Sequence, residues 1–292
     1  MKLLNTYKNG NYKVVLFDDG TKIRQTNEDK FISSFPECID LKITNKCDMG
    51  CKYCHEDSTI TGEHGDILDA EFINTLKPYT ELALGGGNVL CHPNLIEFLT
   101  ILKAKNIIAN ITINQVHFSV YKELIQYILD NELIKGLGIS LTKSPDEEFI
   151  SEIKKYSNIV IHVINGVVQL ADLRKLYNQG FKLLILGYKQ FRRGEDYFSS
   201  DVIINKQIIY HNIEEINKGF KVVSFDNLAI KQLNLRRLFS DEEWQEFYMG
   251  DDGQFTMYID LVKRHFAKNS ISVNRYDLLD NIENMFQKVK EE

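Results

Sequence analysis

Three cysteines, Cys47, Cys51 and Cys54, lie within the eight-residue segment CDMGCKYC. Iron–sulfur clusters are held by thiolates, and three thiolates from one short loop can hold three corners of a [4Fe–4S] cube while one iron stays open. Gly50, inside the segment, can adopt the positive φ that such a tight loop requires. The spacing therefore indicates a loop that binds a metal cluster.

A structural zinc site is the alternative interpretation of this segment. Zinc in such sites takes four protein ligands, and His55 directly follows Cys54. That adjacency strains a tetrahedral arrangement, so we favour the cluster; a non-catalytic zinc or iron–sulfur binding protein stays the alternative from another functional class. Cys38 and Cys91 bring the total to five, an odd number that is poorly suited to a disulfide framework.

The elements that position this loop follow a regular alternation of short apolar runs and longer amphipathic segments. The pattern predicts strands at 38–44, 81–84, 107–113, 138–141, 159–164 and 182–186, and helices at 69–76, 94–104, 120–129, 146–156, 170–178 and 201–218. Strands that are apolar on both faces and separated by helices form parallel sheets covered by those helices. We therefore predict an α/β fold, a partial (β/α)6 TIM-like barrel, with its chemistry at the carboxyl ends of the strands. A doubly wound open sheet is the second choice.

Two appendages flank the predicted barrel. The segment 12–26 alternates around Asp18-Asp19-Gly20 and predicts a β-hairpin. After residue 220 the pattern predicts a helix at 241–248, strands at 254–260 and 261–266, and a helix at 276–289. The predicted parts are an N-terminal hairpin (1–34), the barrel (35–220) and a small α+β extension that covers it (221–292).

The segment CDMGCKYC resembles the CxxxCxxC signature of the radical S-adenosylmethionine (SAM) superfamily. The resemblance implies an enzyme in which Cys47, Cys51 and Cys54 hold a [4Fe–4S] cluster whose open iron binds SAM. Reductive cleavage of SAM then gives a 5′-deoxyadenosyl radical that abstracts hydrogen from a substrate. Tyr53 matches the aromatic residue that the family places near the adenine. The cluster implies a one-electron reductant as partner, such as flavodoxin or ferredoxin.

Further positions resemble the family's SAM-binding residues. Gly86 and Gly87 match the GGE motif after the second strand, where Asn88 replaces the glutamate. An asparagine can accept a hydrogen bond there but carries no charge. The third, fourth and fifth strands end near the remaining matches, which are Asn114, Ser140 and Asn165.

The substrate side of the site is expected at the end of the sixth strand. The loop 187–194 is basic and aromatic, and Tyr188, Arg192 and Arg193 are its candidate substrate contacts. Arginine binds carboxylate or phosphate bidentately. The substrate class implied is a peptide or small metabolite, with a nucleotide or modified base as the alternative; no side chain is singled out as a catalytic acid or base. No cysteine follows Cys91, so the chain resembles a short member without the cysteine-containing SPASM or twitch extension.

The composition of the chain excludes several classes of protein function and location. Hydrophobic residues make up 43% of the 292 residues, enough for a packed core, and the formal net charge is -6. An acidic chain is unsuited to non-specific nucleic-acid binding, which requires a basic surface. Residues 1–10 lack the features of a signal peptide, and no apolar run is long enough to span a bilayer. We therefore expect a cytoplasmic protein with no membrane partner.

Overall fold

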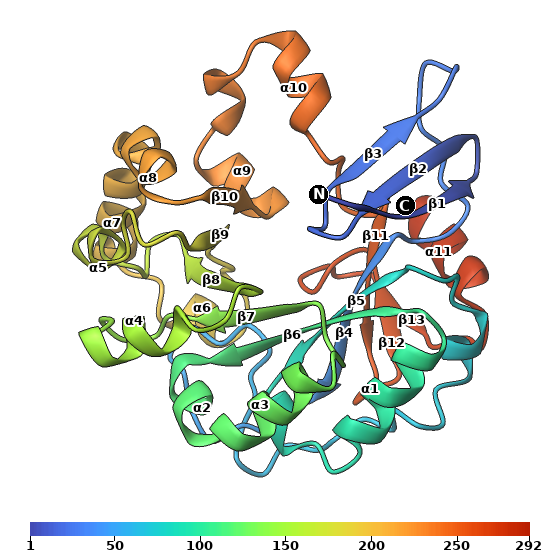
Figure 1. Cartoon of the computed structure of the whole chain (residues 1–292), viewed down its shortest axis with the longest axis horizontal. Coiled ribbons are helices and arrows are strands. Elements are labelled where there is room, and N and C mark those ends of the chain that lie inside the picture. The colour runs from blue at the N-terminus through green and yellow to red at the C-terminus, as the bar shows by residue number, and fades with distance from the viewer.

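The computed structural model describes all 292 residues of the chain. The chain begins with an antiparallel sheet of three strands, β1 (Leu3–Asn9), β2 (Tyr12–Phe17) and β3 (Lys22–Gln25), drawn in blue in Figure 1. The predicted hairpin is confirmed as β2 and β3, which pair across a turn where Gly20 has a φ of 92°. The sequence analysis missed β1.

Ten further strands form one continuous sheet. They are β4 (Cys38–Thr44), β5 (Glu81–Gly86), β6 (Ile108–Asn114), β7 (Gly136–Ser140), β8 (Ile159–Ile164), β9 (Lys182–Leu186), β10 (Val222–Phe225), β11 (Thr256–Asp260), β12 (His265–Ala267) and β13 (Tyr276–Asp277). Their order is β10-β9-β8-β7-β6-β5-β4-β11-β12-β13. All neighbours from β10 to β11 are parallel, whereas β12 and β13 are antiparallel. The six predicted barrel strands are confirmed, and β10 adds a seventh.

The sheet curves without closing. No hydrogen bonds join its two end strands, β10 and β13, so the barrel is partial. β10 and β11 lie beyond residue 220 yet belong to this same sheet. The division into parts ending at residues 34 and 220 stays a prediction.

Helices lie along the outside of the curve, as Figure 1 shows for α1 to α5. The helical elements are η1 (Glu71–Thr75), η2 (Val89–Cys91), α1 (Leu95–Ala104), α2 (Gln115–Val120), α3 (Lys122–Asp130), α4 (Glu147–Ile153), α5 (Leu170–Lys175), α6 (Arg193–Asp196), α7 (Ser200–His211), α8 (Ile213–Gly219), α9 (Asn227–Gln232), η3 (Leu235–Leu238), α10 (Asp241–Phe247) and α11 (Ile282–Lys290). None of them is both long and apolar enough to cross a bilayer.

Several predicted helices differ in extent from those of the structure, and three of them differ in kind or number as well. Segment 69–76 contains only the 3₁₀ turn η1. Segment 201–218 is two helices, because the chain leaves helical geometry at Asn212. Segment 276–289 begins as β13, and its helix starts only at Ile282, where the Asn281 side chain accepts a hydrogen bond from the Asn284 N–H.

The two faces of the sheet differ in polarity. On β4, Ile39, Leu41 and Ile43 belong to a core of 53 buried residues, whereas the alternate positions Asp40 and Lys42 are charged. The inner face, which we call the lumen, is therefore partly polar. The expectation that these strands are apolar on both faces is wrong for β4.

Candidate cofactor site

The three clustered cysteines lie in the loop that leaves the carboxyl end of β4. Gly50 has a φ of 57°, as expected for this turn. The Cys47 N–H donates to the Thr59 carbonyl at 2.8 Å, so the following segment folds back against the loop. All three thiols are free and partly exposed. Burial, followed by the neighbouring cysteines, raises the pKa of Cys51, so a bound cation is needed to favour its thiolate.

The zinc alternative requires His55 as its fourth ligand. The His55 Nε2 lies 3.1 Å from the Lys189 ammonium and 3.4 Å from the Glu56 carboxylate, so it already has partners within the chain. The metal-binding side chains whose ligand atoms lie within 4.8 Å of one another are Cys47, Asp48 and His117, which include only one of the three cysteines. The iron–sulfur cube, which needs only three thiolates from the loop, fits these residues better.

The glycine segment at the end of β5 packs directly on the cysteine loop. A Cβ on Gly86, whose φ is 107°, would lie 2.3 Å from the Thr44 carbonyl oxygen, and one on Gly87 would lie 2.2 Å from that of Lys46. A Cβ on Gly85 would meet nothing within 4 Å. The close backbone contacts thus require glycine at positions 86 and 87. The position of Gly85, to which the sequence analysis gave no role, has free space around it.

Asn88 has a structural role in this segment. It is buried, its side-chain oxygen accepts from the Leu90 N–H, and its amide nitrogen lies 3.4 Å from the Tyr121 hydroxyl. Its predicted contact with SAM stays a prediction.

Asn114 connects β6 to the cysteine loop. Its side-chain nitrogen donates to the Cys51 sulfur at 4.0 Å, while its oxygen accepts from the Val116 N–H at the start of α2. The strand register places Asn114 beside Ser140, and Ser140 beside His162. The structure thus brings Asn114 to the cluster loop and Ser140 next to it. Burial lowers the pKa of His162 to about 4, which makes it a neutral packed residue at neutral pH.

Asn165 and Tyr188 are joined through α9. The Asn165 amide donates to the Gln232 side-chain oxygen, which also accepts from the Tyr188 N–H. The side-chain oxygen of Asn165 is buried and has no hydrogen-bond partner. An unpartnered buried carbonyl is costly, so this side of the site offers an acceptor for a donor from a bound molecule.

A hollow of about 350 Å³ lies beside the loop, lined by aromatic side chains. Tyr53 and Tyr188 share its wall with Lys52 and with residues of the segment 196–202. The Lys206 ammonium lies 5.1 Å from the centre of the Tyr188 ring. Two predicted site residues from distant parts of the chain therefore meet around one cavity.

The two arginines of the loop 187–194 contact the chain itself. Arg192 donates to the carbonyl of Glu56 at 2.9 Å, and Arg193 pairs with the Asp57 carboxylate at 2.8 Å and donates to the Ser58 carbonyl. Both guanidinium groups thus hold the segment that follows Cys54. Their predicted contact with a substrate anion stays a prediction.

A buried charged cluster beside the loop escaped the sequence analysis. We call Lys42, Glu56, Tyr258 and Asp260 the Glu56 cluster. Lys42 lies 2.8 Å from Glu56 and 3.4 Å from Asp260, and Tyr258 donates to the Glu56 carboxylate at 3.1 Å. The only signal was a lysine inside the apolar run of β4.

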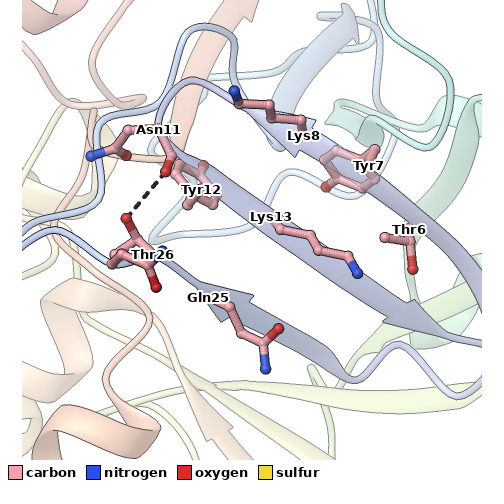
Figure 2. Close-up of a pocket in the computed structure, with 9 residues that line it drawn as sticks. Thr6, Tyr7, Lys8, Asn11, Tyr12, Lys13, Gln25 and Thr26 are labelled. Carbon is pink, nitrogen blue, oxygen red and sulfur yellow. Dashed lines mark hydrogen bonds between the residues drawn. The ribbon is translucent and has the colours of Figure 1, made fainter.

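A second hollow, of about 510 Å³, is formed by β1, β2 and β3 and the residues that flank them. Figure 2 shows its polar lining, including Lys8, Lys13 and Gln25, with the Thr26 hydroxyl donating to the Asn11 carbonyl. No cysteine lines it, so it is separate from the cofactor site.

The family model of the radical SAM superfamily matches residues 41–190, just over half of the chain. No curated protein matches the sequence significantly. The matched range contains the cysteine loop, the glycine segment and the strands that carry Asn114, Ser140 and Asn165.

Solved structures share the fold at low sequence identity. SuiB of Streptococcus suis bound to S-adenosylmethionine gives a TM-score of 0.61 at 11% identity, covering 84% of this chain and 64% of that one. SuiB bound to precursor peptide SuiA gives a TM-score of 0.58 at 13% identity, and the match covers 87% of this chain and 65% of SuiB. Native anSMEcpe with bound AdoMet gives a TM-score of 0.50 at 14% identity, and the match covers 86% of this chain and 79% of anSMEcpe. The chain thus spans less than two thirds of SuiB, and these likenesses describe the fold alone.

Proposed function

The chain belongs to the radical SAM superfamily, whose enzymes use a [4Fe–4S] cluster and SAM, and we propose that Cys47, Cys51 and Cys54 hold the cluster and that the substrate is a peptide. The observation that carries the cluster assignment is the set of three free, partly exposed cysteines on one loop at the carboxyl end of β4. That edge is where parallel barrels place their chemistry.

The cluster and SAM, when bound, supply a carbon-centred radical that removes a hydrogen atom from the substrate. The residues of the chain bind and shield these groups. Asn114 donates a hydrogen bond to the Cys51 sulfur, a contact of the kind that tunes cluster potentials. Tyr53 and Tyr188 line a cavity suited to an aromatic ring, and the buried oxygen of Asn165 is free to accept a hydrogen bond.

Two observations favour a peptide over a nucleotide. The two arginines expected to bind the phosphate of a nucleotide, Arg192 and Arg193, are both engaged by the segment after Cys54. The same fold occurs in SuiB, which has been solved with the precursor peptide SuiA.

Anaerobic reconstitution tests the cofactor assignment. The chain should hold about four iron and four sulfide ions and, with dithionite, should convert SAM to 5′-deoxyadenosine. Changing Cys47, Cys51 and Cys54 together to Ala should remove the iron and abolish cleavage, while Cys38→Ala, outside the loop, should retain both. Stoichiometric zinc in the protein as isolated, with no iron loading, would contradict the proposal.

Stimulation of that cleavage tests the substrate class. Pools of short peptides should accelerate 5′-deoxyadenosine formation, and mass spectrometry should find a peptide whose mass has changed. Stimulation by nucleosides or nucleotides, with none by peptides, would instead support the alternative substrate.

A further inference from the structure

Glu56 is the centre of a dense set of contacts next to the cysteine loop. Its carboxylate lies 2.8 Å from the Lys42 ammonium and 3.8 Å from the Arg192 guanidinium, and it accepts from the Tyr258 hydroxyl at 3.1 and 3.2 Å. Its backbone carbonyl accepts from Arg192 as well. Glu56 is thus held through both its side chain and its main chain.

The partners of Glu56, together with Asp260, which contacts Lys42, come from three distant parts of the chain. Lys42 lies on β4, Arg192 follows β9, and Tyr258 and Asp260 lie on β11. The parallel register places Tyr258 beside Asp40 and Asp260 beside Lys42. A strand near the end of the chain therefore brings two polar side chains into the lumen, directly against the segment that follows Cys54.

The contacts are shielded from water. The side chains of Lys42 and Asp260 are each 1% exposed, and that of Glu56 is 8% exposed. Shielding from water strengthens both the ion pair with Lys42 and the charged hydrogen bond from Tyr258, so together they fix Glu56 in one place. Glu56 is two residues after Cys54, and the intervening turn is closed by the Asp57 N–H donating to the Cys54 carbonyl. Where Glu56 lies thus determines where Cys54 lies.

We propose that Glu56 and Tyr258 are positioning residues for the Cys54 corner of the cluster, so that the C-terminal strand β11 sets the geometry in which SAM is cleaved. The inference rests on the proposed function, because it takes Cys54 to be a cluster ligand. It gives the C-terminal segment a role inside the cofactor site rather than only around the substrate.

The opposite end of β4 provides a matched control. There Tyr12 donates to the Glu37 carboxylate at 2.6 Å, and Arg24 pairs with the same carboxylate at 2.9 Å. Tyr12 and Tyr258 are 2% and 4% exposed. Each tyrosine therefore donates its hydroxyl to a buried, cation-paired glutamate, and only Tyr258 does so beside the cysteine loop.

The test compares Tyr258→Phe with Tyr12→Phe in the reconstituted full-length protein. Both changes should lower the melting temperature by similar amounts, since each removes one hydrogen bond to a buried carboxylate. Tyr258→Phe should alter the EPR signal of the reduced cluster in the presence of SAM and slow 5′-deoxyadenosine formation about tenfold. Tyr12→Phe should leave the spectrum and the rate at the wild-type level.

A second pair of variants separates geometry from folding. Glu56→Asp, which keeps the charge on a shorter side chain, should load iron yet show the same altered EPR signal as Tyr258→Phe. An unchanged spectrum and rate in Tyr258→Phe, or equal losses in Tyr12→Phe, would overturn the inference while wild-type protein still cleaves SAM. Wild-type protein that neither loads iron nor cleaves SAM would refute the proposed function as well.

Discussion

At the scale of single residues, the sequence motif identified the three cysteines but not the hydrogen bonds that neighbouring side chains make to them. Asn114 was expected among the SAM-binding residues, and in the structure its amide donates to the Cys51 sulfur. Hydrogen bonds to cluster sulfurs are among the protein's means of setting the reduction potential.

Asn114→Ala should therefore make the reduction potential of the cluster more negative, because a donor that stabilises the reduced, more negative cluster is lost. A potentiometric titration followed by EPR measures the shift. The variant also loses a helix cap, which costs about 1 kcal/mol, so Asn281→Ala, which removes the cap of α11, is the control. A potential equal to that of wild type would show that the contact with Cys51 has no electrostatic effect.

Asp40 makes stability depend on pH. Its carboxyl group is enclosed by neighbouring residues, although its side chain keeps some surface open to the lumen. Burial raises its pKa to about 6; Lys189 opposes this, while Asp252, Asp226 and Glu56 add to it.

Because the folded pKa is above the unfolded value near 4, the folded state binds the proton more tightly, and the protein loses stability as pH rises between about 4 and 6. Asp40→Asn should remove this loss, so the melting temperature of the variant relative to wild type should rise across that window and level off above it. A difference that does not vary with pH would contradict the assignment. Since the side chain is open to solvent, we expect a small effect.

At the scale of elements, close backbone approach explains the glycine segment. The end of β5 and the loop after β4 lie so close to one another that there is no room for a side chain at Gly86. At Gly85 there is room for one. Gly86→Ala should destabilise the protein by about 1–3 kcal/mol, because its positive φ is strained for any other residue and its Cβ would meet the Thr44 carbonyl. Gly85→Ala should cost less than about 1 kcal/mol. Thermal unfolding of the two variants measures the difference, and equal destabilisation would show that the approach of these elements is not what requires glycine.

The elements themselves could largely be predicted because each depends on local pattern. The six strands of the barrel and the loop after the first of them followed from periodicity and cysteine spacing. β10 was missed because it has only four residues, of which Val222 is exposed. Its pairing with β9 depends on tertiary structure, which the local sequence does not show. The Glu56 cluster was missed for the same reason, since nothing near Glu56 in the sequence indicates that Lys42 and Tyr258 will contact its carboxylate.

At the scale of the whole molecule, the main sheet unites segments that are far apart in the chain. The first barrel strand, β4, is paired on one side with β5, which follows soon after, and on the other with β11, more than two hundred residues later. The two edge strands of this sheet, β10 and β13, both lie beyond residue 220, so the partial barrel is complete only when the C-terminal segment has joined it.

That pairing has a consequence for folding during synthesis. As the ribosome delivers the chain from its N-terminus, β4 can pair with β5 early, but its other edge stays unpaired until residues 256–260 have emerged. Contacts of such long sequence separation form slowly, because a large loop must close first. An unpaired edge strand is also a site for aggregation. The nascent protein thus passes through a stage in which the cysteine loop exists but Tyr258 and Asp260 are absent, so we expect cluster insertion to follow release of the complete chain.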